Sequence, residues 1–185
     1  MITCIRAKVK VGAIFYLSPW GGKSMERSTV FSKCRKYRYT LWRQWDFTNP
    51  SYAMFIGLNP STADEVQNDP TVARCIDYSM RWGFGALCMM NIFSFRATLP
   101  SVMKAQADPV GKENNYWLVE IARNASVIVA AWGTHGSHLD RHRQVVALLG
   151  GKLQCLKETK EGFPSHPLYL KKSLTPVPYI GANSC

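Results

Sequence analysis

The chain has 185 residues, of which 46% are hydrophobic and 12% aromatic, and it carries a formal net charge of +11 at pH 7. A chain of this length favours a single domain whose core needs neither disulfides nor a metal, and the apolar content excludes a largely disordered protein. No apolar run approaches the roughly 20 residues of a membrane span. We therefore expect one folded domain that does not cross a membrane.

The positive charge is concentrated near the start of the chain. Residues 1–50 hold ten Lys and Arg but only two acidic residues. Such a stretch fits a polyanionic partner, with nucleic acid first and an anionic membrane surface second. A solubilising surface or a loose tail would have the same composition.

Cysteine usage indicates a reducing compartment. The six cysteines are spread along the chain and none forms a Cys-x-x-Cys pair, so we expect free thiols. The short apolar run 11–17 lacks a small-residue cleavage site, so no secretory signal is expected. A cytoplasmic protein follows from both observations.

In chain order, the first predicted element is an irregular basic arm. Residues 1–33 show no periodicity and contain the turn-like segment 18–22, so we place a single domain at 34–180. Residues 37–45 are rich in aromatic and β-favouring residues that partly alternate, which predicts an edge strand. Residues 52–58 are continuously apolar, which is typical of a strand buried on both faces.

Helices and buried strands then alternate. Residues 70–82 have apolar residues at helical spacing and begin with a proline suited to a first helical turn, and 86–93 form a second apolar run. A short connector or helical turn follows at 100–107. The spacing in 112–123 predicts another helix, and 126–132 predicts a third buried strand.

The last predicted elements complete this alternation. Residues 138–149 predict an amphipathic helix closed by two glycines, and 153–156 predict a fourth short strand. Four alternations of strand and helix predict a three-layer α/β/α fold with a central, mainly parallel four-stranded sheet and an added edge strand.

Polar residues follow the ends of the predicted strands. The carboxyl ends of parallel strands meet at one edge of a sheet, where open α/β sheets bind ligands. We therefore expect one cleft to contain the residues that follow the four strands. They are Asn59, Asn91, the Trp132–Gly133 turn and His166.

Each polar residue near the cleft has a functional and a structural interpretation. The Asn59 amide could hold a water or a carbonyl, or bond its own backbone in the turn. Asp64 or Asp69 could activate water or cap the following helix, and the sequence does not choose between them. Asn91 ends an apolar strand and needs a partner, either the edge of a nucleobase or the backbone.

An aromatic ring and an imidazole also belong to the candidate site. Phe93 follows Asn91 and could stack on a base or belong to the core. His166 lies in a Ser-His-Pro segment that is predicted to be a loop. Its imidazole could bond a ligand carbonyl or a developing oxyanion, or be a plain surface group.

Three further histidines have spacings of three and four residues. On one helix face, His135, His138 and His142 would be placed to bind a metal. No carboxylate or cysteine completes a known pattern, and His135 precedes the predicted helix. We therefore expect neither a metal nor another cofactor.

The order of these motifs resembles the uracil-DNA glycosylase superfamily over residues 52–169. In that superfamily the first turn positions the attacking water, a strand ending in Asn contacts the base, and a His-Pro loop bonds the base and presses on the DNA minor groove. The first turn here has Asn, as in the mismatch-specific and thymine-type branch, so uracil need not be the substrate. The resemblance is carried by Gly57–Ser61, Leu87–Phe93, Val127–Gly133 and His166–Leu168.

A second resemblance covers about residues 34–179. It is to a family of unknown function numbered 1643, which has no settled activity. Its hallmarks correspond to the segments 58–64, 68–71, 91–98, 131–133 and 166–169.

The glycosylase resemblance implies a monofunctional DNA glycosylase that hydrolyses the N-glycosidic bond of a flipped, modified or damaged base and leaves an abasic site. The implied catalytic residues are Asn59, Asp64, Asp69 and His166. The implied base contacts are Gly57, Leu58, Asn91 and Phe93. The implied DNA contacts are Ser61, Thr62, Arg96, Pro167, Leu168 and Tyr169, together with Arg35, Lys36 and Arg38 near the start of the domain.

The expected partner is DNA, bound through its phosphate backbone and one flipped base by a monomer. Two other classes stay open. One is a non-catalytic binder of nucleic acid or nucleotides on the same fold, and the other is a hydrolase of free nucleosides or nucleotides.

Overall fold

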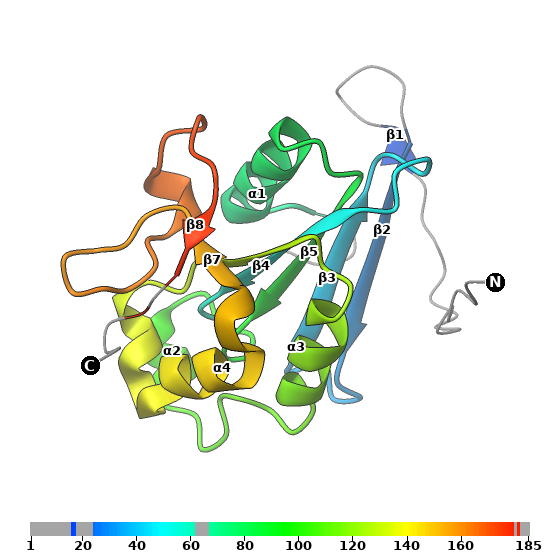
Figure 1. The fold of residues 1–185 in the computed structure, drawn as a ribbon. Coiled ribbons are helices and arrows are strands. Elements are labelled where there is room, and N and C mark those ends of the chain that lie inside the picture. The colour runs from blue at the N-terminus through cyan, green and yellow to red at the C-terminus, as the bar shows by residue number, and fades with distance from the viewer. Residues whose placement is uncertain (1–15, 18–23, 62–66, 180, 182–185) are drawn as a thin grey trace.

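The fold of the computed structural model is built on one mixed sheet (Figure 1). The structure describes residues 16–17, 24–61, 67–179 and 181. Its eight strands follow the order β1-β2-β3-β5-β4-β6-β7-β8, and the four strands from β5 to β7 are mutually parallel. Each of these four lies at a predicted buried strand. They are β4 (Tyr52–Gly57), β5 (Ala86–Asn91), β6 (Val127–Ala130) and β7 (Leu153–Cys155).

Antiparallel strands extend this parallel centre on both sides. They are β1 (Tyr16–Leu17), β2 (Ser24–Phe31) and β3 (Arg38–Gln44) beside β5, and β8 (Val177–Pro178) beside β7. The prediction that 37–45 forms an edge strand is wrong, because β2 pairs along the outer side of β3. Residues 24–31 are likewise a strand and not an irregular arm. The rest of the predicted arm, 1–15 and 18–23, lies outside the described residues.

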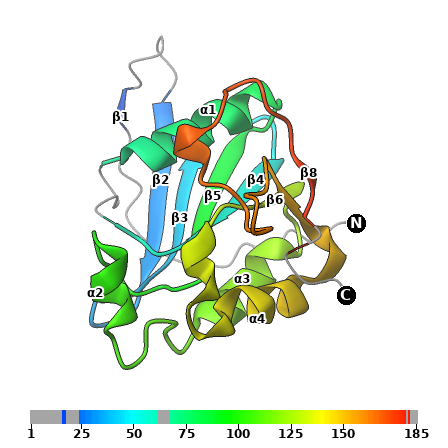
Figure 2. The ribbon, with the colours of Figure 1, turned by 90° about the vertical axis from the view of Figure 1, so that its left-hand side faces the viewer.

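Helices cover both faces of the sheet, so the predicted three layers are present (Figures 1 and 2). Alternate residues of β4 point to opposite faces. Phe55 packs in the cluster that contains residues of α1, whereas Met54 packs with residues of α2, α3 and α4. The helices are α1 (Pro70–Arg81), α2 (Pro100–Lys104), α3 (Asn114–Ala122) and α4 (Arg141–Leu149). The short 3₁₀ helices are η1 (Thr134–Asp140), η2 (Gly150–Lys152) and η3 (Pro167–Tyr169).

The predicted helix over 138–149 begins later than its sequence pattern indicates. Leu139 and Asp140 have φ values of 53° and 51°, in the left-handed region that a continuous right-handed helix excludes. The preceding segment, η1, instead packs against Trp132. Gly136 permits this approach, because a Cβ there would lie 2.3 Å from the Cδ1 atom of Trp132.

A buried arginine fixes the loop that follows β5. Arg141 is only 1% exposed, and its guanidinium donates to the carbonyl oxygen of Ile92 at 2.9 Å. It also donates to Asn115 Oδ1 at 2.5 Å and to Gln144 Oε1 at 3.1 Å. Burial lowers the pKa of Arg141 to about 10, which leaves the group charged at neutral pH. Three neutral acceptors therefore stabilise this cation and tie the end of β5 to α3 and α4.

Replacing this arginine should destabilise the fold strongly. Arg141→Met removes the donors to three partly or fully buried acceptors, and we expect the free energy of unfolding to fall by about 2–4 kcal/mol. The control is Arg143→Met on the same helix, where an exposed Arg143–Asp140 pair separated by 3.9 Å is lost; we expect less than about 1 kcal/mol. Urea unfolding of both variants measures the difference, and equal losses would contradict this role of Arg141.

Candidate functional site

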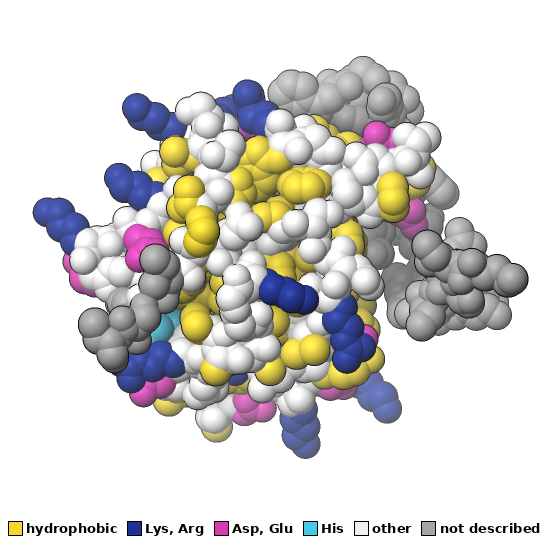
Figure 3. All heavy atoms as spheres, viewed as in Figure 1, with side chains coloured by type: hydrophobic (Ala, Val, Ile, Leu, Met, Phe, Trp, Pro, Cys, Tyr) yellow, Lys and Arg dark blue, Asp and Glu magenta, His cyan; other side chains and the backbone are white. Residues whose placement is uncertain are grey.

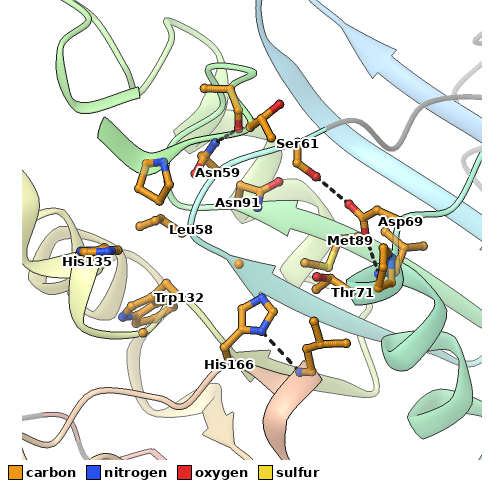
Figure 4. Close-up of a pocket in the computed structure, with 18 of the residues that line it drawn as sticks. Leu58, Asn59, Ser61, Asp69, Thr71, Met89, Asn91, Trp132, His135 and His166 are labelled. Atoms are coloured by element: carbon orange, nitrogen blue, oxygen red, sulfur yellow. Dashed lines mark hydrogen bonds between the residues drawn. The ribbon is translucent and has the colours of Figure 1, made fainter. Parts of the chain in front are cut away.

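A cavity of about 600 Å³ lies at the carboxyl ends of the parallel strands (Figure 4). This volume is within the range of about 300–1,000 Å³ that is typical of small-molecule sites. The structure brings together in it all four polar places that follow the predicted strands. Its lining comprises Arg38, Gly57, Leu58, Asn59, Ser61, Asp69, Pro70, Thr71, Val72, Met89, Asn91, Ala97, Thr98, Pro100, Trp132, Gly133, Thr134, His135, His166, Leu168 and Tyr169.

The Asn91 amide, at the end of β5, is oriented by a buried arginine. Asn91 is 2% exposed, and its Oδ1 accepts a hydrogen bond from Arg38 Nη2 at 3.2 Å. Because a guanidinium can only donate, the amide oxygen must face Arg38, which directs Nδ2 elsewhere. Nδ2 lies over Gly57, where a Cβ would be 2.9 Å from it. The absence of a side chain at position 57 therefore leaves room for the amide, whose Nδ2 is a hydrogen-bond donor.

Arg38 lies in the interior of the site and not on the outer surface. The sequence predicts that Arg38, near the start of the domain, contacts DNA, whereas the structure makes it a residue of β3 that is only 3% exposed. Its side chain lines the cavity and bonds Asn91. The DNA contact of Arg38 stays a prediction, and its place is the cavity and not the outer surface, because the antiparallel pairing of β3 with β5 turns Arg38 toward the end of β5.

Asn59 is held by its surroundings through its amide nitrogen. Nδ2 donates to the carbonyl oxygen of Ala97 at 2.7 Å and to that of Pro60 at 3.1 Å. The sequence leaves open whether the Asn59 amide holds a ligand or bonds the backbone, and the structure shows that it bonds the backbone. The amide oxygen is the remaining group through which Asn59 could orient a water, as an acceptor only.

Asp69 joins two walls of the cavity. One carboxylate oxygen accepts from the backbone N–H of Val72 at 2.8 Å, which caps α1, and the other accepts from Ser61 Oγ at 2.8 Å. Among the described residues that line the cavity, Asp69 is the one that has a carboxylate. The other carboxylate candidate, Asp64, and the predicted DNA contact Thr62 lie outside the described residues.

The hydrogen bonding of His166 determines which nitrogen of its imidazole ring carries the proton. It precedes η3, and its Nδ1 accepts from the backbone N–H of Leu168 at 3.4 Å. Burial lowers the pKa of His166 below its usual 6.5, and the nearby charge of Asp69 opposes this shift only in part. The ring is therefore neutral at pH 7 and carries its proton on Nε2, the nitrogen that Figure 4 shows directed into the cavity.

The rim of the cavity contains a pair that sequence reasoning missed. Lys104 Nζ, on α2, lies 3.3 Å from His135 Nδ1, on η1. The spacing of His135 suggests only a metal ligand, and nothing in it indicates α2 as a neighbour. Gly133 N donates to the Pro164 carbonyl oxygen at 2.9 Å, which connects this rim to the loop of His166.

Other predicted site residues lie outside the cavity lining. Phe93 is completely buried in the core beside His138, with ring centroids 5.6 Å apart, so the expectation that it contacts a base is wrong. Pro167 is also buried and does not line the cavity. Tyr169, in contrast, is 84% exposed at the rim. Three predicted DNA contacts, Arg35, Lys36 and Arg96, line an adjacent cavity.

The three spaced histidines do not share a helix face. His135 belongs to η1, whereas His142 is buried on α4 with Nδ1 3.2 Å from the Gly136 carbonyl oxygen. Within the part of the chain that the structure describes, no group of three or more His, Cys, Asp or Glu side chains is placed to hold a metal. The described cysteines, Cys34, Cys75, Cys88 and Cys155, are free thiols.

The fold and site define an α/β protein with a cavity at the strand ends of a parallel sheet, lined by both polar and apolar side chains. A sequence model of the family described as "Protein of unknown function (DUF1643)" matches residues 38–168, and the chain belongs to that family. The matched segment runs from β3 to η3 and includes nearly all of the cavity lining. None of the curated proteins and none of the solved structures matches the chain. Among the described residues, no helix has both the length and the apolar composition to cross a membrane.

The lowered pKa of His166 predicts a specific pH dependence of stability. The unfolded chain takes up a proton on His166 below about pH 6.5, whereas the folded protein resists doing so. Folding stability should therefore fall as the pH drops through this value. We expect the free energy of unfolding to fall more in the wild type than in His166→Gln between about pH 7.5 and about pH 5.5. An identical change in both proteins, measured by urea unfolding, would show that His166 does not titrate differently on folding.

Proposed function

We propose that this protein is a monofunctional DNA glycosylase that hydrolyses the N-glycosidic bond of a flipped, modified or damaged base. The observation that carries the proposal is the placement of the His166 ring, whose Nδ1 accepts from Leu168 N and whose Nε2 is directed into a cavity that Asn91 and Asp69 also line. The cavity is recessed at the strand ends, so a base within a duplex must leave the stack to reach it. The same proposal includes the fold: the order of the motifs implies that the four parallel strands are arranged as in the uracil-DNA glycosylase superfamily.

Recognition of the base rests on Asn91. Its Nδ2 offers a hydrogen bond to an acceptor on the base, such as an exocyclic carbonyl oxygen. Arg38 holds the Asn91 amide so that its nitrogen and oxygen cannot exchange places. A base with a hydrogen-bond donor at this position would therefore bind less well than a base with an acceptor. Leu58 and Trp132 supply apolar surface on the cavity wall for the faces of the base.

The chemistry follows from groups on different sides of the cavity. As the bond from the sugar C1′ to the base nitrogen breaks, its electron pair leaves with the base, and His166 Nε2–H stabilises the developing negative charge. A water attacks C1′, which has oxocarbenium character, and its proton passes to the carboxylate of Asp69. The acceptor oxygen of Asn59 orients that water. The departing base anion then takes up a proton from solvent, and Asp69 releases the proton it accepted, so that the products are the neutral free base and an abasic site.

The rim residues suit a duplex partner. Tyr169 is highly exposed and lies beside His166, with ring centroids 5.6 Å apart and the ring planes tilted by 46°. Leu168 lines the cavity next to it. Either side chain is placed to fill the space that a flipped nucleotide leaves in the stack.

A non-catalytic binder is the second candidate, because the groups assigned to water activation already have hydrogen-bond partners. Asn59 Nδ2 donates to two backbone carbonyls, and both carboxylate oxygens of Asp69 accept hydrogen bonds. Such a site would bind a base without cleaving it.

The test is incubation of the protein with single- and double-stranded DNAs that carry different base modifications, followed by mass spectrometry of released bases and alkaline cleavage of abasic strands. A glycosylase releases at least one base and leaves an alkali-labile strand. DNA binding without any released base supports the binder instead. Release from free nucleosides but not from DNA supports the hydrolase of free nucleosides.

On the substrate so identified, Asp69→Asn should separate catalysis from structure. Asn caps helices about as well as Asp, so the free energy of unfolding should change by less than about 1 kcal/mol. Loss of the proton acceptor should lower kcat by about 10²-fold or more. The control is Asp77→Asn on the same helix, whose carboxylate pairs with Arg81 and Lys172. Full activity in Asp69→Asn would overturn the role given to this carboxylate.

A further inference from the structure

A second cavity, of about 490 Å³, adjoins the first. Ser61, Ala97 and Thr98 line both cavities, so the two are separated by no more than the segments that carry these residues. The remaining lining of the second cavity is Arg35, Lys36, Phe95, Arg96 and Gln106. No acidic residue occurs among the described residues that line it. We refer to it as the basic side cavity.

The cationic residues of the basic side cavity come from two segments that are bonded to each other. Arg35 and Lys36 lie in the turn between β2 and β3, and Arg96 lies in the loop after β5. Arg96 N donates to the Lys36 carbonyl oxygen at 2.9 Å, and Arg96 Nη1 donates to the Arg35 carbonyl oxygen at 3.2 Å. The backbone thus holds three like charges close together.

Two of these cations, Arg35 and Arg96, also lie over the aromatic ring of Phe31. The Cζ atoms of Arg35 and Arg96 lie 4.3 Å and 4.9 Å from the centre of the Phe31 ring, within the range of cation–π attraction. The Nε atom of Arg96 is buried and has no hydrogen-bond partner among the described residues. A buried donor of this kind is costly unless a ligand accepts from it.

The positive charge of the basic side cavity favours the binding of an anion. Among the ion pairs of the described residues, none includes Lys36 or Arg96. On the face of the molecule seen in Figure 3, Lys and Arg side chains are scattered and do not form one continuous patch. The basic side cavity, in contrast, gathers the cations Arg35, Lys36 and Arg96 in one lining. Arginine and lysine donors together match the oxygens of a phosphate.

We propose that the basic side cavity binds a phosphate group of the nucleotide whose base occupies the main cavity, or of its immediate neighbour. This inference rests on the proposed function for the identity of the base site. The shared wall of Ser61, Ala97 and Thr98 is what couples the two sites, since a base and a sugar phosphate are joined through one sugar. The phosphate comes either from a nucleic-acid strand or from a free nucleotide, and the experiment separates these sources.

Equilibrium binding, which needs no catalysis, tests the inference. The probes are a fluorescein-labelled single-stranded oligonucleotide carrying an abasic-site analogue, and unlabelled nucleoside 5′-monophosphates and nucleosides as competitors. The variant Lys36→Gln/Arg96→Gln should weaken binding of phosphate-bearing probes by on the order of 10-fold. For the strand, it should also reduce the slope of log affinity against log salt by about 1. The matched control is Lys152→Gln/Arg123→Gln, whose residues precede the amino ends of β7 and β6, at the opposite edge of the sheet.

The outcomes are distinct. A loss for the oligonucleotide alone assigns the phosphate to a strand, and a loss for the mononucleotides assigns it to a free nucleotide. Affinities and salt slopes that match those of the wild type would overturn the inference, as would an equal loss for nucleosides. The single variant Lys36→Gln, at an exposed residue, repeats the test if the double variant fails to fold. The glycosylase proposal fails by a different result: the wild-type protein binds these probes but releases no base from any of the modified DNAs.

Discussion

A buried amide at the end of a central strand is the constraint around which the site is organised. Asn91 ends β5 where the apolar strands of the sheet give way to the cavity, and its amide cannot be left without partners in such a place. Arg38 donates to its oxygen, and Gly57 leaves space beside its nitrogen. The side chain of Asn114 donates to its backbone carbonyl at 3.1 Å. Residues from β3, β4 and α3 thereby fix one donor at the edge of the sheet.

The second fixed donor, His166, is held by a different part of the chain. The loop from β7 to η3 brings it to the same cavity, and burial keeps its ring neutral. A neutral ring with its proton on Nε2 can donate a hydrogen bond without carrying a charge that would have to be desolvated. Asp69 supplies the negative charge of the site, and its bonds to Ser61 and to the start of α1 hold it in place. Two donors and one carboxylate in one cavity are the basis of the proposed hydrolysis.

Sequence patterns were sufficient where each residue follows a local rule. The four parallel strands were predictable because runs such as 52–57 are continuously apolar, and α1 because its apolar residues recur at helical spacing behind Pro70. The meeting of Asn59, Asn91 and His166 followed from the geometry of parallel sheets alone.

Features that depend on long-range pairing could not be predicted in this way. Strand β2 has few apolar residues and is recognisable only through its pairing with β3, which in turn makes β3 an interior strand. The burial of Phe93 depends on how the chain turns after β5, and that turn is set by Arg141 and Asn114 from distant helices. The tautomer of His166 likewise depends on a single backbone N–H, that of Leu168, which no spacing reveals.

The most direct test of this account is the nitrogen NMR spectrum of the His166 ring at neutral pH, assigned by comparison with His166→Gln. The site requires a neutral imidazole with the proton on Nε2, because only that form accepts from Leu168 N and donates into the cavity. We predict one protonated and one unprotonated ring nitrogen, with Nδ1 unprotonated. A doubly protonated ring, or a neutral ring with the proton on Nδ1, would contradict the account, because the cavity would then lack the donor assigned to it.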